Sequence, residues 1–266
     1  MTSLLGVLLG FLCIIGGALT DHVPLSSLLN LTAFIIVLCG SFAAGMVHFG
    51  IGSLLSGLKS VLWLAKPPRV DLQKFINQVA EWSTLARSQG TLALENVIPE
   101  VQDPFQRQGL QMIVDNTSPE DFGAILGVME DKIGRTQGVA GEVWEALGGY
   151  SPTIGVMGAV LGLIHVMMRL DHPSELGEGI ATAFIATVYG VGFANLVALP
   201  LGAKLKHLAK ELERERHVII QGFMLLAEGK PGIVIRQNLQ SFLEHDKQTA
   251  KDGGGEEPDA ITQPAE

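Results

Sequence analysis

The residues best suited to chemistry lie in two apolar runs, 151–168 and 179–201, which a short acidic turn separates. Neither run contains Asp, Glu, Lys or Arg, but together they carry hydroxyl groups at Thr153, Thr182 and Thr187. An ion that crosses hydrocarbon needs an ionisable or strongly polar partner, because desolvating a bare cation is prohibitively costly. The two runs could therefore form one wall of an ion path, provided that another chain supplies an acid.

Two prolines stand near the ends of these runs, Pro152 in the first and Pro200 in the second. A proline removes a backbone donor and bends a helix, so each could act as a hinge or expose a carbonyl. For Pro152, a plain helix-boundary role explains the residue equally well. Each threonine also has an ordinary alternative, a hydrogen bond to a carbonyl of its own helix. The first run contains small residues that let another helix approach closely: Gly155, Gly158, Ala159 and Gly162.

The sequence contains none of the common catalytic patterns. It has no phosphate-binding loop, no nucleotide fingerprint and no His-Glu-x-x-His. Its two cysteines, Cys13 and Cys39, lie inside apolar runs, so neither a disulfide framework nor a thiolate metal site is indicated. A net charge of −9 disfavours nucleic-acid binding, which requires a basic face. The sequence therefore predicts no enzyme and no cofactor.

The composition predicts a membrane protein. The chain has 266 residues, a mean hydropathy of +0.35 and 17% charged residues, against about 25% in ordinary soluble proteins. Two more apolar runs, 1–19 and 28–58, precede the pair described above, and each of the four could cross about 30 Å of hydrocarbon. Residues 1–19 lack a basic start and a cleavage site, which favours an uncleaved span. The second run exceeds one perpendicular crossing and should tilt or project. His48 in this run could handle protons, but a neutral imidazole at a helix interface or near the headgroups is the favoured interpretation.

Positive charge sets the expected orientation. Basic residues gather directly after the second and fourth runs, at Lys59, Lys66, Arg69, Lys74, Lys204, Lys206 and Lys210. By the positive-inside rule, these flanks and both termini should be cytoplasmic. The predicted fold class is an all-α membrane protein with four transmembrane helices and a helical cytoplasmic domain between spans two and three. The expected segments are a hairpin (1–58), the cytoplasmic domain (59–150), a second hairpin (151–203), cytoplasmic helices (204–245) and a disordered tail (246–266).

The second hairpin also resembles a known family. Residues 175–206, ELGEGIATAFIATVYGVGFANLVALPLGAKLK, closely resemble the fourth span of the MotA-type flagellar motor stator subunits, of the MotA/TolQ/ExbB proton channel superfamily. SPTIGVMGAVLGLIHVM resembles their third span. The resemblance implies a subunit of the bacterial inner membrane, in a ring of five identical copies surrounded by lipid. The ring would enclose a MotB-type partner, anchored to peptidoglycan, that supplies a membrane aspartate.

The resemblance also implies roles for particular residues. Pro152 and Pro200 match prolines that couple ion passage to conformational change. Arg87 lies eight residues before Glu95, which is the family's spacing for two charges that face the rotor's switch protein in the flagellar C-ring. Without the resemblance, these two residues would be ordinary surface charges.

Other matched residues concern the ion. Thr187 matches the family's threonine near the partner's carboxylate. Ala159 stands where sodium-driven relatives tend to have threonine, and His165 matches a histidine common in proton-driven relatives. Because a missing hydroxyl removes a sodium ligand, the transported ion is expected to be a proton. Thr153 and Thr182 are expected to face the partner as well.

Two alternatives stay open from the sequence. An ExbB/TolQ-type energiser of an outer-membrane process shares the last hairpin but has three spans, so the run 1–19 counts against it. A passive membrane scaffold would explain four helices, but not both prolines or the spacing of Arg87 and Glu95. One departure from the family pattern is a proline, Pro231, placed one position early, with Gly232 where proline is expected.

Overall fold

The computed structural model describes residues 2–20, 28–67, 70–171 and 173–251. Every element in these ranges is helical, which confirms the prediction of an all-α protein. The chain divides into two compact units, which we call the first unit (Met1–Arg69 with Asp131–Glu213) and the second unit (Val70–Glu130 with Arg214–Glu266). The predicted turn after residue 20 falls largely on 21–27, outside the described residues.

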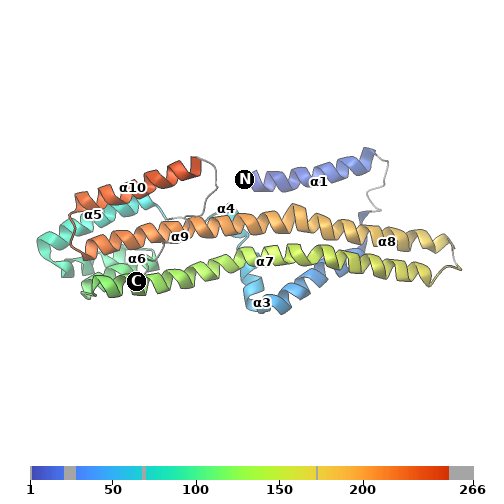
Figure 1. Cartoon of the computed structure of the whole chain (residues 1–266), viewed down its shortest axis with the longest axis horizontal. Coiled ribbons are helices and arrows are strands. Elements are labelled where there is room, and N and C mark those ends of the chain that lie inside the picture. The colour runs from blue at the N-terminus through green and yellow to red at the C-terminus, as the bar shows by residue number, and fades with distance from the viewer. Residues whose placement is uncertain (1, 21–27, 68–69, 172, 252–266) are drawn as a thin grey trace, which may run out of the picture. The chain divides into compact units, whose positions relative to one another are not determined.

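Long antiparallel helices form the first unit. From Asp131 on, α7 lies beside the continuous run of α8, η5 and the start of α9 (Figure 1). Its elements are α1 (Thr2–Thr20), α2 (Leu31–Phe34), η2 (Ile35–Cys39), α3 (Gly40–Lys59), α4 (Leu62–Ala65), α7 (Pro119–Met167), α8 (Pro173–Gly192), η5 (Phe193–Ala198) and α9 (Leu199–Ala227).

Among the described residues, three helical runs are long and apolar enough to cross a membrane: Leu31–Leu64, Glu120–Met167 and Gly179–Ala227. Leu5–Thr20 is a shorter apolar helix. The 49 residues of α7 measure roughly 74 Å at 1.5 Å per residue, more than twice the hydrocarbon thickness. The predicted third span is therefore the last part of a single helix that begins at Pro119.

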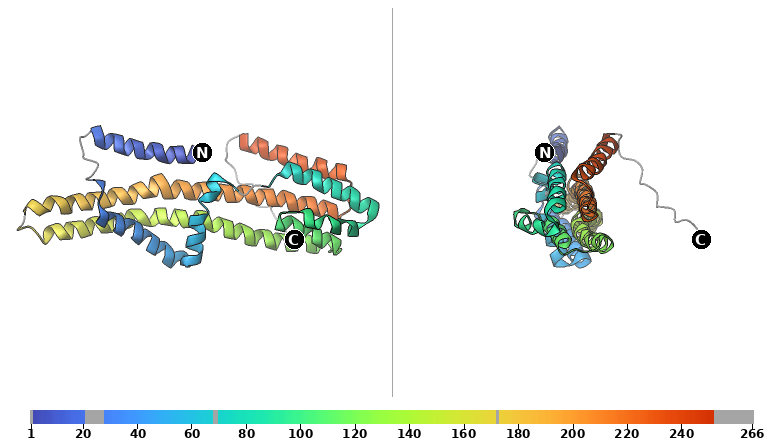
Figure 2. Two further views of the ribbon diagram at one scale, coloured as in Figure 1. Left: turned by 180° about the vertical axis from the view of Figure 1, so that it is seen from behind. Right: turned by 90° about the vertical axis from the view of Figure 1, so that its left-hand side faces the viewer.

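The second apolar run is bent rather than simply tilted. Gly50 in α3 has φ 73° and ψ 160°, a conformation that glycine reaches easily because it lacks a Cβ. The chain changes direction sharply within α3 (Figure 2). The bend explains how a run longer than one perpendicular crossing is accommodated, because the residues beyond Gly50 need not continue in the direction of the residues before it.

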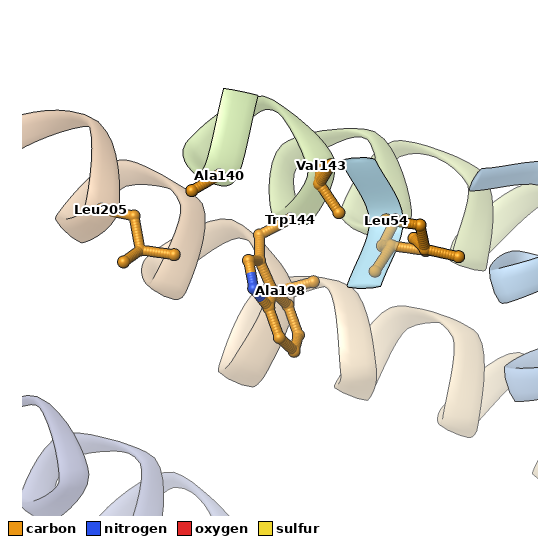
Figure 3. Packing of buried hydrophobic residues seen from close by; sticks show 7 residues of the cluster. Leu54, Ala140, Val143, Trp144, Ala198 and Leu205 are labelled. Carbon is orange, nitrogen blue, oxygen red and sulfur yellow. The ribbon is translucent and has the colours of Figure 1, made fainter. Parts of the chain in front are cut away.

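A hydrophobic cluster joins α3, α7 and α9 inside the first unit. Its buried members are Leu54, Ala140, Val143, Trp144, Leu147, Ala198 and Leu205 (Figure 3). The Trp144 indole donates a buried hydrogen bond of 3.1 Å to the carbonyl of Gly57, so its one polar atom is satisfied. A Cβ built on Gly57 would lie 2.8 Å from Val143, which shows how closely α3 approaches α7. Trp144 is therefore a packing residue.

The contact between α7 and α8 is a seam of small residues. A Cβ built on Gly155 would lie 2.9 Å from the carbonyl oxygen of Ala186, and one on Gly190 would lie 2.5 Å from that of Ser151. On Gly162 it would lie 3.0 Å from the backbone nitrogen of Ala183. Only glycine fits such backbone-to-backbone packing, which is how helices associate without a hydrophobic driving force between them.

An aromatic core organises the second unit. The ring of Phe223 lies 5.5 Å from that of Phe75, stacks on Trp82 at 6.1 Å and lies 6.2 Å from that of Phe122. Phe75 and Trp82 come from the helical pattern predicted for this region. The elements are α5 (Leu72–Gln89), η3 (Thr91–Asn96), η4 (Ile98–Glu100), α6 (Pro104–Val114), the start of α7, the end of α9 and α10 (Gly232–Lys251).

The turn between α9 and α10 accounts for the early proline. A Cβ on Gly232 would lie 2.5 Å from the carbonyl oxygen of Ala80, so no larger residue fits there. The Ser83 hydroxyl donates a 2.6 Å hydrogen bond to the Lys230 carbonyl and holds the turn against α5. The helix α10 continues to Lys251, past the predicted start of the tail, and residues 252–266 lie outside the described part of the chain.

The seam predicts a sharp difference between two neighbouring glycines. Gly190→Ala should cost about 1–3 kcal/mol, because the new methyl group would collide with the backbone of α7. The measurement is the thermal unfolding midpoint of the purified protein in detergent. Gly192→Ala is the matched control, since a Cβ there meets nothing within 4 Å. Equal midpoints for the two variants would contradict the seam.

Candidate functional site

The first proline, Pro152, lies inside α7 and removes the amide that would bond the carbonyl of Gly148. The preceding residue compensates. The Ser151 side chain is fully buried, and its hydroxyl lies 3.4 Å from the Gly148 carbonyl and 3.1 Å from the carbonyl of Gly190 on α8. Ser151 thus ties the proline site to the facing helix. Sequence analysis assigned no role to Ser151, because its partner lies on another helix.

The second proline, Pro200, is exposed and is the second residue of α9. It follows directly on η5, a turn of π-helix over Phe193–Ala198. A π-turn carries one extra residue, is costly, and is often found where a helix has a functional distortion. Pro200 has no amide for the Leu196 carbonyl, so the helix is irregular on both sides of this position. Both predicted hinges therefore lie at real departures from α-helical bonding.

Of the four predicted partner-facing residues, Thr187, Thr153 and Ala159 form no side-chain hydrogen bond to another helix within the described residues. Thr187 is half-buried and donates a 3.3 Å hydrogen bond to Ala183. Thr153 is exposed and donates one of 2.8 Å to Tyr150. These are bonds within one helix, the ordinary alternative for threonine. Ala159 is half-buried on α7. In the chain alone, both hydroxyl oxygens keep lone pairs for a further donor.

Thr182 belongs to a polar network that links α8 to the start of α2. The side-chain amide of Asn30 donates a 2.8 Å hydrogen bond to the Thr182 hydroxyl, and its oxygen caps α2 by accepting from Ala33 at 2.9 Å. The backbone amide of Asn30 donates to the Tyr189 hydroxyl at 3.3 Å. Sequence analysis missed this network, because Asn30 and Tyr189 are 159 positions apart.

A cavity of about 470 Å³ adjoins this network. Thr182 and Gly179 of α8 line it together with Gly162, His165 and Arg169 from the α7 side and Thr32 of α2. Polar groups from three elements therefore meet in one hollow. The structure brings Thr182 and His165 together there, whereas Thr187, Ala159 and Thr153 are not among its lining residues.

His48 is connected to the proline site. Its Nδ1 lies 2.7 Å from the hydroxyl of Tyr150, and its ring stacks on Phe49 with centroids 4.1 Å apart. Tyr150 is two residues before Pro152, and His48 is two residues before the bend at Gly50. This bond therefore joins the bend in α3 to the proline site in α7.

The predicted charged pair lies in the second unit. Arg87 is in the last turn of α5 and Glu95 is in η3, with Gly90 at φ 88° turning the chain between them. Both side chains are exposed. In the part of the chain that the structure describes, neither forms an ion pair. Their charges are therefore available to a partner.

The described residues contain no group of three or more His, Cys, Asp or Glu side chains that could hold a metal ion. What the first unit does contain is a pair of apolar runs without Asp or Glu, 151–168 and 179–201, with a buried hydroxyl at Ser151, irregular backbone at two prolines and a polar hollow. These features are typical of a multi-pass membrane subunit whose helices face an ion path, rather than of a simple anchor.

Comparisons with known proteins agree with this class. The model of the MotA/TolQ/ExbB proton channel family matches residues 97–217. Motility protein A of Bacillus subtilis is 33% identical over 244 residues, covering 91% of this chain and 90% of the relative. The chain therefore belongs to the MotA/TolQ/ExbB proton channel family. Within it, the chain is of the MotA type, a flagellar stator subunit and not an enzyme.

Two solved structures have the same fold. The structure of C. jejuni MotAB matches with a TM-score of 0.82 and 29% identity, covering 92% of this chain and 96% of that one. The flagellar MotAB stator complex from Bacillus subtilis gives a TM-score of 0.81 and 31% identity, covering 94% and 99%. The resemblance stated from the hairpin residues is thus confirmed over nearly the whole chain.

The buried hydroxyl of Ser151 yields a prediction. Ser151→Ala should cost about 1–3 kcal/mol, because the carbonyls of Gly148 and Gly190 lose a buried donor. Thr136→Ala is the matched control on the same helix, since the exposed Thr136 hydroxyl bonds only to Lys132 of its own helix. That control should change the stability by less than about 0.5 kcal/mol. Unfolding midpoints that do not separate the two variants would contradict this role of Ser151.

Proposed function

We propose that this chain forms, with a MotB-type partner, an inner-membrane stator complex that couples proton flow to torque on the flagellar rotor. The observation that carries the proposal is the pair of facing apolar runs 151–168 and 179–201, which contain no Asp or Glu and carry the two proline sites. Such a pair makes mechanical sense only beside a chain that brings a titratable group. The two structural relatives, described as MotAB and as a MotAB stator complex, support the choice of partner.

The membrane topology is part of the proposal. We infer four spans, with the short helix α1 as the first, and with both termini and residues 59–150 in the cytoplasm. The positions of the basic residues support this orientation. The ExbB/TolQ-type alternative is not carried forward, because the relatives that cover 91% of this chain and at least 90% of their own length are motility proteins.

Ion passage would take place against the wall made by α7 and α8. In the proposal, the partner's aspartate lies near Thr187 and Ala159, with Thr153 and Thr182 on the same route. Protonation removes the charge of the aspartate, which lowers the cost of moving the partner helix along the wall. A ring of five copies would then rotate stepwise around the partner. Each proton contributes roughly 2.3 kcal/mol per 100 mV of membrane potential.

A proton is proposed in preference to sodium. Ala159 offers no side-chain oxygen at the position where sodium-driven relatives tend to have threonine. Sodium requires several oxygen ligands in place of its hydration shell, whereas a proton needs only one acceptor at a time. The alanine therefore leaves this wall one ligand short of such a sodium site, although the hydroxyl oxygens of Thr187 and Thr153 keep lone pairs.

Torque would leave the ring through Arg87 and Glu95. Their exposure and lack of an ion pair within the described residues support contact with a charged partner, which we propose is the rotor's switch protein. Surface charges steer such contacts and set their specificity more than their affinity.

The central test is motility. In a strain deleted for every stator set, the unmodified gene with its partner should restore swimming, and Pro152→Ala or Pro200→Ala should not. Alanine restores the amide and straightens the helix, so the hinge is lost while the fold remains. Expression and complex formation, followed by size-exclusion chromatography, are the controls. Normal swimming of both variants would sink the proposal, as would swimming that survives a protonophore but stops without sodium.

The rotor contact has a separate test. Arg87→Glu should reduce swimming strongly without changing assembly, because the altered charge faces the rotor and not the membrane. Lys74→Glu is the matched control, an exposed reversal in the first turn of the same helix. If both reversals impair swimming equally, Arg87 has no special place at the interface. A compensating reversal in the switch protein should restore swimming of the Arg87 variant only.

A further inference from the structure

A second cavity in the first unit, of about 530 Å³, lies between α1 and the junction of η5 with α9. One wall is formed by Gly6 and Val7 of α1, and the other by Leu196 and Leu201. Lys204 and His207, at the far end, add the basic groups. The proposed ion path does not involve this hollow, and its lining is mostly apolar.

The cavity lies beside the contact between α1 and η5. A Cβ built on Gly10 would lie 2.9 Å from the side chain of Leu196, so the helices touch there. One turn earlier, a Cβ on Gly6 would meet nothing within 4 Å, and Gly6 lines the cavity. The helix α1 runs antiparallel to η5 and α9 (Figure 2), so Lys204 of α9 lies on the Gly6 side of this contact. The two glycines of one G-x-x-x-G pair thus have different surroundings.

The chemistry of the two ends differs. Near η5 the lining is aliphatic, with Leu196 and Leu201, which a polar ligand would not favour. Further along α9 the lining includes Lys204, an exposed ammonium group that forms no ion pair within the described residues. His207 lies one turn further along α9, with Nε2 3.3 Å from a carboxylate oxygen of Glu211. An apolar slot that ends at a cation matches one acyl chain joined to an anionic headgroup.

We propose that this cavity binds an anionic phospholipid of the inner leaflet, with an acyl chain between α1 and η5 and the phosphate against Lys204. The placement in the inner leaflet rests on the topology given under Proposed function. Pro200 also lines the cavity, so the lipid lies against one of the two hinges. At Pro200, α9 lacks one backbone hydrogen bond and would also lack packing contacts if the cavity were empty. The lipid supplies those packing contacts.

The test measures the lipid that stays with the purified complex. The complex of this chain with its partner is extracted from phosphatidylglycerol-containing membranes, washed in detergent, and its lipids are counted per subunit by mass spectrometry. Lys204→Gln should lower the retained phosphatidylglycerol about fivefold, the equivalent of about 1 kcal/mol for one cation at a membrane surface. Lys210→Gln, an exposed lysine on the same helix outside the cavity, should leave it unchanged.

A second pair of variants tests the acyl slot. Gly6→Phe should displace the lipid by filling the free space beside Gly6, and Leu9→Phe, on an exposed part of the same helix, should not. Size-exclusion chromatography confirms that each variant still assembles. Unchanged retention in both Lys204→Gln and Gly6→Phe would mean that protein from a neighbouring copy fills the cavity, which overturns the proposal.

The headgroup is tested by exchange. Excess phosphatidylcholine should not displace the bound phosphatidylglycerol, and neither should inorganic phosphate. Displacement by phosphatidylcholine would overturn the preference for an anionic lipid, and displacement by phosphate would identify a soluble-anion site instead. If the unmodified complex restores swimming but retains no phosphatidylglycerol after the detergent wash, this inference is refuted and the proposed stator function is not.

Discussion

In hydrocarbon, a backbone carbonyl without a donor costs several kcal/mol, and this chain places two prolines where such carbonyls arise. At Pro152 a side chain supplies a donor, the buried hydroxyl of Ser151. At Pro200 the backbone itself departs from α-helical bonding, in the π-helical turn Phe193–Ala198 that precedes the proline. The first solution depends on the glycine seam, because the Ser151 hydroxyl reaches Gly190 only where the two helices are in backbone contact.

Much of the fold was predictable because it is local. Apolar runs, proline positions and glycine spacing indicated the helices, the seam and the hinge sites, and the resemblance of the last hairpin indicated the family. These features depend on residues a few positions apart, which a sequence displays directly.

The features that were missed depend on contacts between distant segments. The bend at Gly50 could not be told from any other glycine in an apolar helix, since its cause is a backbone angle. The bonds of Asn30 with Thr182 and of His48 with Tyr150 join residues more than a hundred positions apart. For Thr187 and Ala159, sequence and structure describe the wall and not its partner, so their roles stay proposals.

The Ser151 hydroxyl has one proton and two acceptors, at 3.1 Å on the neighbouring helix and at 3.4 Å on its own. It cannot satisfy both fully, so its one proton is divided between an acceptor on its own helix and an acceptor on the facing helix. The same hydroxyl therefore links the local geometry at Pro152 to the spacing between α7 and α8. A change in the α7 bend would alter both distances at once.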